Sequence, residues 1–222
     1  NLICISSMIT FRKLTFLLTI PLLCASSHSL DAKLTWKDMP NAFRCVLDKN
    51  TRVLVVKLND TTAIAYDTGK CQMIKIWQNK DGRLIDLTGP VFNGQHGKQP
   101  LSIGETLVTE KAALFSYRSA VRDSSLPRLQ YRGHKLNEEK TTLIYAYLDD
   151  QGHELAVIEE TPMIKNNIVS RSFKITLSDH DEWGAIQFNQ PAEQKWMLNG
   201  KILSTFNIKK STTISLSISL TK

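Results

Sequence analysis

Apolar and polar residues alternate along most of this chain, which is the pattern of half-buried β-strands. In the C-terminal segment 212–220, aliphatic residues at positions 214, 216, 218 and 220 alternate with serine or threonine. One face of this segment is therefore predicted to be buried and the other solvated. Similar runs, rich in β-branched and aromatic residues, are 52–58, 63–67, 71–77, 112–117, 141–148, 154–160, 168–177, 185–188 and 201–206.

Turn-forming residues separate these runs. Asn199-Gly200 lies between two short apolar segments, and the positive φ that both residues tolerate favours a type I′ hairpin. Segments 79–82 and 149–152 are predicted to form longer turns. Strands that recur every eight to twelve residues or so are typical of an antiparallel sandwich. The sequence predicts an all-β, antiparallel β-sandwich, of which a large super-sandwich is one form, with little helix after the signal peptide described next.

The N-terminal segment has the features of a secretory signal peptide. The basic pair Arg12-Lys13 precedes an apolar run at 14–25, and small polar residues follow. Such a run is too short to remain as a membrane anchor. We expect residues 1–29 to comprise upstream residues plus the signal and residues 30–222 to form a single β-sandwich domain. The predicted location is periplasmic or extracellular, without stable membrane insertion after cleavage.

The charge of the chain argues against a nucleic-acid partner. The formal net charge is +7, and loss of Arg12 and Lys13 with the signal would lower it to +5. Lysines and arginines are scattered along the sequence instead of clustering with aromatic residues, as a nucleic-acid groove requires.

Two cysteines, Cys45 and Cys71, lie outside the signal segment. In an oxidising compartment, two such cysteines are expected to pair. A bridge between residues 26 positions apart would stabilise the fold by about 3.5 kcal/mol. The sequence therefore predicts a Cys45–Cys71 disulfide, and two buried free thiols are the alternative.

Local motifs for metal or nucleophilic chemistry are missing from the sequence. The histidines lack partners at metal-ligand spacing, and neither Cys-x-x-Cys nor Gly-x-Ser-x-Gly occurs. The adjacent Glu159 and Glu160 should point to opposite faces of a strand, so they cannot flank one glycosidic bond. We predict no metal, no cofactor and no catalytic residue.

A ligand-binding site is predicted in the N-terminal half. Counting alternate positions along 71–77 puts Cys71, Met73, Lys75 and Trp77 on one face, so Trp77 is expected to be exposed beside a lysine. Exposed rings beside charged and amide groups are suited to binding sugars. The alternative is that Trp77 and Tyr66 fill the core. The predicted lining residues are Arg52, Tyr66, Asp67, Lys75, Trp77, His96 and Gln99.

Several short motifs in this half resemble one known region. They are Phe43-Arg44-Cys45-Val46-Leu47-Asp48, Ala65-Tyr66-Asp67-Thr68, Lys75-Ile76-Trp77, His96-Gly97 and Gln99-Pro100. The region is a β-sandwich that accompanies c-type cytochrome and quinoprotein sugar-dehydrogenase-like modules in large secreted bacterial proteins. The resemblance covers about residues 40–160 and implies a role near sugar metabolism outside the cytoplasm. It implies no electron transfer by these residues.

Three functions follow as hypotheses. The favoured one is a secreted, non-catalytic β-sandwich domain that binds a glycan or docks onto a carbohydrate-oxidising redox partner. The alternative is a carbohydrate-active lyase or hydrolase in which His96 acts as a base beside Asp67 or Asp48. A structural domain that binds no small ligand is the third.

Overall fold

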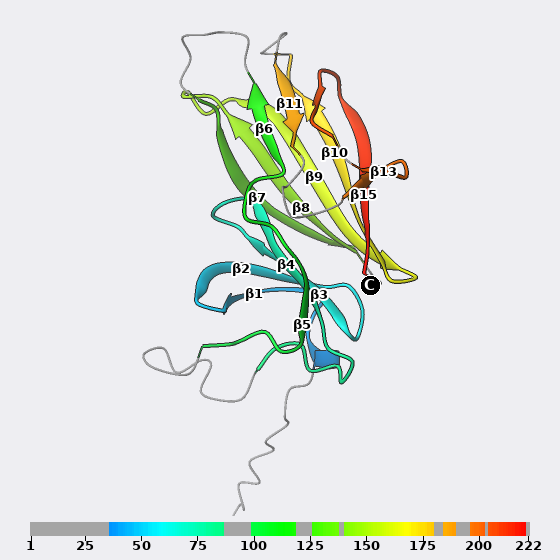
Figure 1. Ribbon diagram of the computed structural model, residues 1–222. Helices are drawn as coiled ribbons and strands as arrows, with labels where there is room; N and C mark the ends of the chain where they lie inside the picture. Colours follow the sequence, from blue (N-terminus) through cyan, green and yellow to red (C-terminus); the bar gives the residue numbers. More distant parts are fainter. Residues whose placement is uncertain are drawn as a thin grey trace, which may run out of the picture. The chain divides into compact units, whose positions relative to one another are not determined.

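The structure is an all-β sandwich. The computed structural model describes residues 36–86, 99–118, 126–137, 140–179, 184–189, 196–202 and 204–220. Residues 34–222 belong to one compact unit. Within the described ranges, the strands form three antiparallel sheets and the helical content is one 3-10 turn, Trp36–Asp38 (Figure 1). The predicted fold class is confirmed.

The first sheet has five strands in the order β1-β2-β3-β4-β5. Each strand is antiparallel to its neighbours. The strands are β1 (Ala42–Leu47), β2 (Asn50–Lys57), β3 (Thr62–Asp67), β4 (Gln72–Gln78) and β5 (Glu105–Thr109).

The other two sheets have seven and three strands. The seven-stranded sheet has the order β13-β12-β15-β10-β9-β8-β7, and the three-stranded sheet has the order β14-β11-β6. The larger sheet comprises β7 (Arg128–Asn137), β8 (Lys140–Leu148), β9 (Glu154–Lys165), β10 (Ile168–Leu177), β12 (Met197–Leu198), β13 (Lys201–Ile202) and β15 (Thr212–Ser219). The smaller comprises β6 (Phe115–Arg118), β11 (Ala185–Phe188) and β14 (Phe206–Ile208).

One hydrophobic core joins the three sheets. The three-stranded sheet contributes Phe115, whose ring centroid lies 6.0 Å from that of Phe173 in β10. The five-stranded sheet contributes Leu54 and Ile64, both fully buried. The two smaller sheets thus cover the same face of the seven-stranded sheet, which is the layered packing that a sandwich requires.

Strands with regular alternation match their predictions closely. β15 buries Leu216 completely, and Ile214 and Ile218 pack against the core. The predicted tight hairpin is present between β12 and β13, where Asn199 and Gly200 have φ of 51° and 76°. Because both central residues have positive φ, the turn has the backbone that the Asn-Gly dipeptide favours.

Other strands differ from the prediction. The segment predicted as one strand at 201–206 contains β13 and the start of β14, which belong to different sheets. Strands β1, β5 and β7 were not predicted, because their side chains do not alternate cleanly: the exposure of β7 is mixed along its whole length. β7 is also an edge strand, which explains the weak apolar signal.

A second, smaller core lies on the other face of the five-stranded sheet. It contains Trp36, Val53, Val55 and Trp77, and Leu84 also packs into it. Residues 84–86 and 99–103 run across this core and pair through an isolated bridge between Ile85 and Ser102. Residues 99–103, at the end of the long connection between β4 and β5, thus lie over a face of the sheet.

The predicted Cys45–Cys71 disulfide is wrong, because the structure holds both residues as free thiols. Cys71 belongs to the large core, whereas Cys45 packs against the smaller core on the opposite face of the same sheet. Sulfur atoms on opposite faces cannot approach bonding distance without reorganising the sheet.

We expect both cysteines to be alkylated when the purified protein is unfolded and treated with iodoacetamide without a reductant. In the folded protein, labelling should be slow, because burial raises the pKa of Cys45 and of Cys71 to about 11 and the thiolate is the reactive form. Peptide mass spectrometry measures the label at each site. Recovery of the two peptides linked through their sulfur atoms would contradict the structure.

Candidate functional site

Trp77 is buried, contrary to the prediction of an exposed ring. A β-bulge in β4 makes Ala65 pair with Lys75 and Tyr66 pair with Met73, which leaves Ile74 as the extra residue. The bulge reverses the alternation, so Trp77 and Lys75 face the smaller core while Met73 faces the large one. The indole N–H of Trp77 donates to the Leu84 carbonyl at 2.8 Å.

Tyr66 points away from Trp77. It lies in the large core, where its hydroxyl donates to Glu160 Oε1 at 2.7 Å. Both rings are fully buried. The predicted aromatic platform is therefore not formed, and the alternative, that Trp77 and Tyr66 fill the core, is the arrangement found.

Lys75 takes part in a polar tie at the edge of the smaller core. Its ammonium contacts Asp48 Oδ2 and Ser102 Oγ and lies 5.1 Å from the centroid of the Trp77 ring. Ser102 donates to Asp48 through its amide and its hydroxyl, each at 2.9 Å. Although partial burial acts to raise it, the bonds from Lys75 and Ser102 hold the pKa of Asp48 below its ordinary value.

This tie is a structural arrangement. The Ser102 hydroxyl donates to Asp48 Oδ2 at 2.9 Å and accepts from Lys75, so it is bound within the tie. The tie fixes residues 99–103 to the β1–β2 turn, where the Asp48 amide also donates to the Pro100 carbonyl at 3.1 Å.

Asp67 and Arg52 meet at the β3–β4 turn. Asp67 Oδ1 accepts the amides of Gly69 and Lys70 at 2.9 and 3.0 Å, and Oδ2 accepts from the Asn50 side chain at 2.9 Å. The Arg52 side chain lies across Gly69: a Cβ at position 69 would lie 3.0 Å from Arg52 Cδ and 3.3 Å from Nη1. The absent side chain of Gly69 leaves the space that the guanidinium occupies.

The remaining predicted residues do not join this group. Gln99 is exposed at the start of the segment that crosses the smaller core, and His96 lies outside the described residues.

Exposed cations surround the β3–β4 turn. β1 and β3 run in the same direction, so the β1–β2 and β3–β4 turns lie at one end of the sheet (Figure 1). Arg44 extends to this end, where Nη2 donates to Thr68 Oγ1 at 3.5 Å. Sequence reasoning listed Arg52 but missed three neighbours. We call this group the cationic turn end, and it consists of Arg44, Lys49, Arg52 and Lys70.

None of these four cations has a carboxylate partner within the described ranges. Some exposed cations elsewhere do: Arg132 lies 3.1 Å from Glu154, and Lys135 and Lys174 lie 2.8 and 3.1 Å from Glu159. Others in the described ranges, such as Arg83, Arg128 and Lys165, also lack one, so the feature of this end is that four such cations lie on adjacent strands and turns. The acids nearest the cationic turn end, Asp48 and Asp67, are already bound by amides, Asn50, Ser102 and Lys75. A ligand with negative charge or many hydroxyl groups would therefore find uncompensated donors here.

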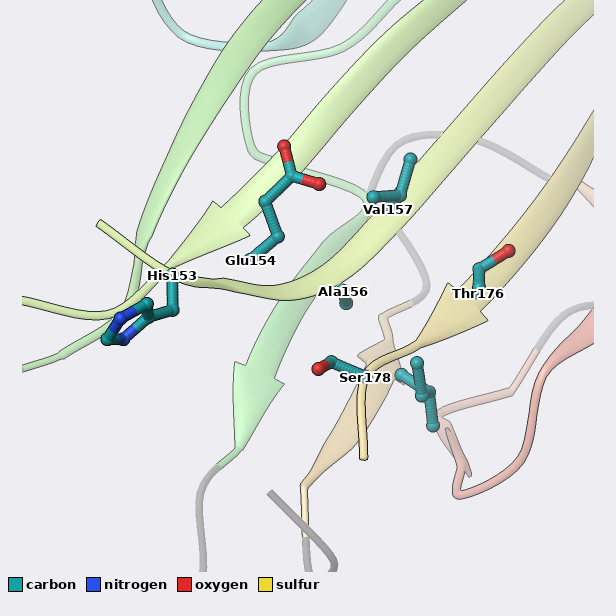
Figure 2. A pocket seen from close by; sticks show the side chains of 7 residues that line it. His153, Glu154, Ala156, Val157, Thr176 and Ser178 are labelled. Atoms are coloured by element: carbon teal, nitrogen blue, oxygen red, sulfur yellow. The ribbon is translucent and has the colours of Figure 1, made fainter. Parts of the chain in front are cut away.

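A hollow of about 370 Å³ lies elsewhere, at the ends of β9 and β10. Figure 2 shows His153 and Glu154 on one side of it and Thr176 and Ser178 on the other. Its charged groups already have partners: His153 Nδ1 lies 2.9 Å from Asp149, and Glu154 contacts Arg132. None of the predicted ligand residues lines the hollow, so we place the candidate site at the cationic turn end.

A buried charge cluster was also missed. Arg171 in β10 is 1% exposed, and it donates to Glu160 through Nε at 2.6 Å and to Glu110 through Nη1 at 2.8 Å. Trp196 donates to the same Glu110 oxygen at 2.9 Å. Among the described residues, Glu110 Oε2 has no hydrogen-bond partner. The cluster is closed to solvent and is structural.

The faces of Glu159 and Glu160 confirm that adjacent acids in a strand separate. Glu160 is 1% exposed inside the core, whereas Glu159 lies on the outer face between Lys135 and Lys174. Glu160 and Arg171 occupy inward positions of otherwise apolar alternating runs, and this was the signal in the sequence that could have revealed the cluster.

Protein-family models, curated proteins and solved structures give no match to the chain. The resemblance to a region beside cytochrome and sugar-dehydrogenase-like modules therefore stays a prediction. Within the described ranges, no helix is long and apolar enough to cross a bilayer, and no group of acids, histidines and cysteines could hold a metal ion.

We expect the stability of the wild type, relative to Glu110→Gln, to fall as the pH rises above about 4.5. Burial raises the pKa of Glu110 from 4.5, although Arg171 opposes the shift. When the pH exceeds the ordinary pKa of a glutamate, Glu110 releases its proton in the unfolded chain. In the folded chain it must keep the proton or become a buried charge, so the unfolded state is favoured as the pH rises. Urea unfolding of both proteins between about pH 4 and about pH 8 measures the difference between their free energies of unfolding.

The control for this experiment is Glu159→Gln. Hydrogen bonds from Lys135 and Lys174 lower the pKa of Glu159, so its contribution should have the opposite sign and be lost as the pH falls. A constant difference between wild type and Glu110→Gln across the range would show that Glu110 does not titrate differently in the folded protein.

Proposed function

We propose that this chain is a secreted, non-catalytic β-sandwich module that binds a glycan at the cationic turn end. The observation that carries the proposal is the placement of Arg52. Its guanidinium lies on Gly69 beside the Asp67 carboxylate, and Asp67 is held by three hydrogen bonds. Because Arg52 is exposed and forms no ion pair in the described ranges, its guanidinium donors are available to hydroxyl or carboxylate groups of a ligand.

The neighbouring groups support a sugar ligand. Asn50 and Thr51 belong to the same end of the sheet, and Thr51, Lys49 and Lys70 are exposed. The exposed hydroxyl of Thr51 and the cations beside it provide the directional hydrogen bonds that polar ligands require, while Asn50 holds Asp67. The resemblance noted in the sequence also implies a role near sugar metabolism, and export is the location that the N-terminal segment predicts.

The hydrolase or lyase alternative has less support. It requires Asp67 or Asp48 to orient a histidine base. Both oxygens of Asp67 accept hydrogen bonds from its own turn and from Asn50, and both oxygens of Asp48 accept from Ser102, with Lys75 also bound to one of them. Both oxygens of each carboxylate therefore already accept hydrogen bonds that stabilise a turn or the segment packed on it.

Docking onto a carbohydrate-oxidising redox protein is the second form of the same hypothesis. Exposed cations without partners can also guide association with an acidic protein surface. A pull-down with secreted redox proteins distinguishes this form from direct glycan binding.

The test is binding of the purified protein to a glycan array, with Arg52→Gln compared to wild type. We expect the bound glycans to lose about three- to tenfold in affinity, since the variant removes one exposed charge-assisted contact. Circular dichroism checks that the sheet content is unchanged.

The matched control is Lys174→Gln, which removes one positive charge from the outer face of the seven-stranded sheet. Because Lys135 still contacts Glu159 in that variant, we expect it to fold and to bind as the wild type does. Equal binding by wild type and Arg52→Gln, with both folded, would exclude the cationic turn end as the site.

A further inference from the structure

We propose that the ligand of the cationic turn end is an acidic glycan, a uronate chain whose carboxylates contact the four cations. This inference rests on the proposed function and adds the chemical class of the glycan. Its first basis is charge: Arg44, Lys49, Arg52 and Lys70 are exposed, and they have no carboxylate partner in the ranges that the structure describes. A neutral glycan has no group that could neutralise this positive charge.

The second basis is the backbone at Lys49. Asp48 and Lys49 form the central residues of the β1–β2 hairpin, with φ of 49° and 70°. Aspartate tolerates this left-handed conformation, but lysine has no local hydrogen bond that favours it. Asp48 is fixed by Ser102 and Lys75, so the tie holds the turn and keeps the Lys49 side chain at its tip. Both central residues of a type I′ hairpin have positive φ, so the hairpin itself places Lys49 at an exposed tip.

The third basis is the spacing of the cations. They come from β1, the β1–β2 turn, β2 and the β3–β4 turn, so they are distributed over neighbouring strands that lie about 4.8 Å apart. A single small anion would contact one or two of them. A chain with a carboxylate on each sugar could contact several of the cations in succession. Each contact would add a modest contribution to the binding free energy, and this contribution would decrease as the salt concentration rises.

A nucleic acid carries comparable charge but fits less well. Single strands bind on exposed aromatic rings that stack with the bases. The turns at 47–50 and 67–72 contain no aromatic residue; they supply aspartate, asparagine, threonine and lysine. Hydroxyl and amide groups between cations suit the hydroxyls between uronate carboxylates.

The experiment uses polygalacturonate, its fully methyl-esterified form and a single-stranded oligonucleotide, each titrated into the purified protein at low and high NaCl. The two polysaccharides share a backbone and differ in charge. We expect polygalacturonate to bind with an affinity that falls as salt rises, and the methyl ester to bind at least about tenfold more weakly.

Three variants locate the effect. Arg52→Gln and Lys49→Gln should each weaken polygalacturonate binding about three- to tenfold. Gly69→Ala keeps every charge but places a methyl group 3.0 Å from Arg52 Cδ, so it should displace the guanidinium and also weaken binding. Lys174→Gln should bind as the wild type does.

The outcomes separate this inference from the proposed function. If the methyl ester or neutral glycans on the array bind as tightly as polygalacturonate, the glycan function stands and the acidic class is wrong. If the oligonucleotide binds more tightly than polygalacturonate, the acidic-glycan assignment is also wrong. Binding to no glycan at all, charged or neutral, overturns both.

Discussion

The guanidinium of Arg171 lies between two carboxylates in the interior, and both large sheets must close around it to keep these charges paired. Glu160 and Arg171 belong to the seven-stranded sheet, whereas Tyr66 and Glu110 come from the five-stranded sheet or directly follow it. Removing one partner from such a cluster typically costs about 3–5 kcal/mol, because a charge is left buried without compensation. The cluster therefore penalises arrangements in which the two sheets shift relative to each other.

The β-bulge at Ile74 connects this cluster to the other face of the sheet. The Ile74 carbonyl accepts the Glu110 amide at 3.0 Å, and the Gln72 side chain donates to the Glu110 carbonyl at 3.0 Å. The bulge thus helps to position Glu110 toward Arg171, and it also turns Lys75 toward Asp48. One extra residue in β4 sets the placement of the buried acid on one face and of the lysine tie on the other.

The same bulge explains what the sequence could predict. Where alternation runs without interruption, as in β10 and β15, both the strands and their buried faces follow from period-two counting. At Ile74 the counting fails by one residue, and every face assigned beyond it is inverted. The face assigned to Trp77 was therefore wrong, and its burial depends on residues 84–86 and 99–103, which cover the second face of the sheet. The Cys45–Cys71 pairing was expected from the oxidising compartment, and it fails because the two residues lie on opposite faces of the sheet. Part of the candidate site could be predicted from the sequence, which identified Arg52 and Asp67 as ligand residues. Arg44 and Lys70 could not be predicted, because only the register of the neighbouring strands brings them beside Arg52.

The charge of the cationic turn end is a consequence of how its turns are stabilised. Aspartates suit tight turns because their oxygens accept nearby amide hydrogens, and Asp48 and Asp67 both do so here. These bonds occupy both oxygens of each carboxylate, and within the described ranges neither aspartate forms an ion pair with Lys49, Arg52 or Lys70. The aspartate oxygens are therefore used to stabilise the turns, and Lys49, Arg52 and Lys70 have no carboxylate partner in the described ranges. Turn stability and positive potential are coupled at this end of the sheet, since a rearrangement that freed either aspartate to pair with a cation would also release its turn.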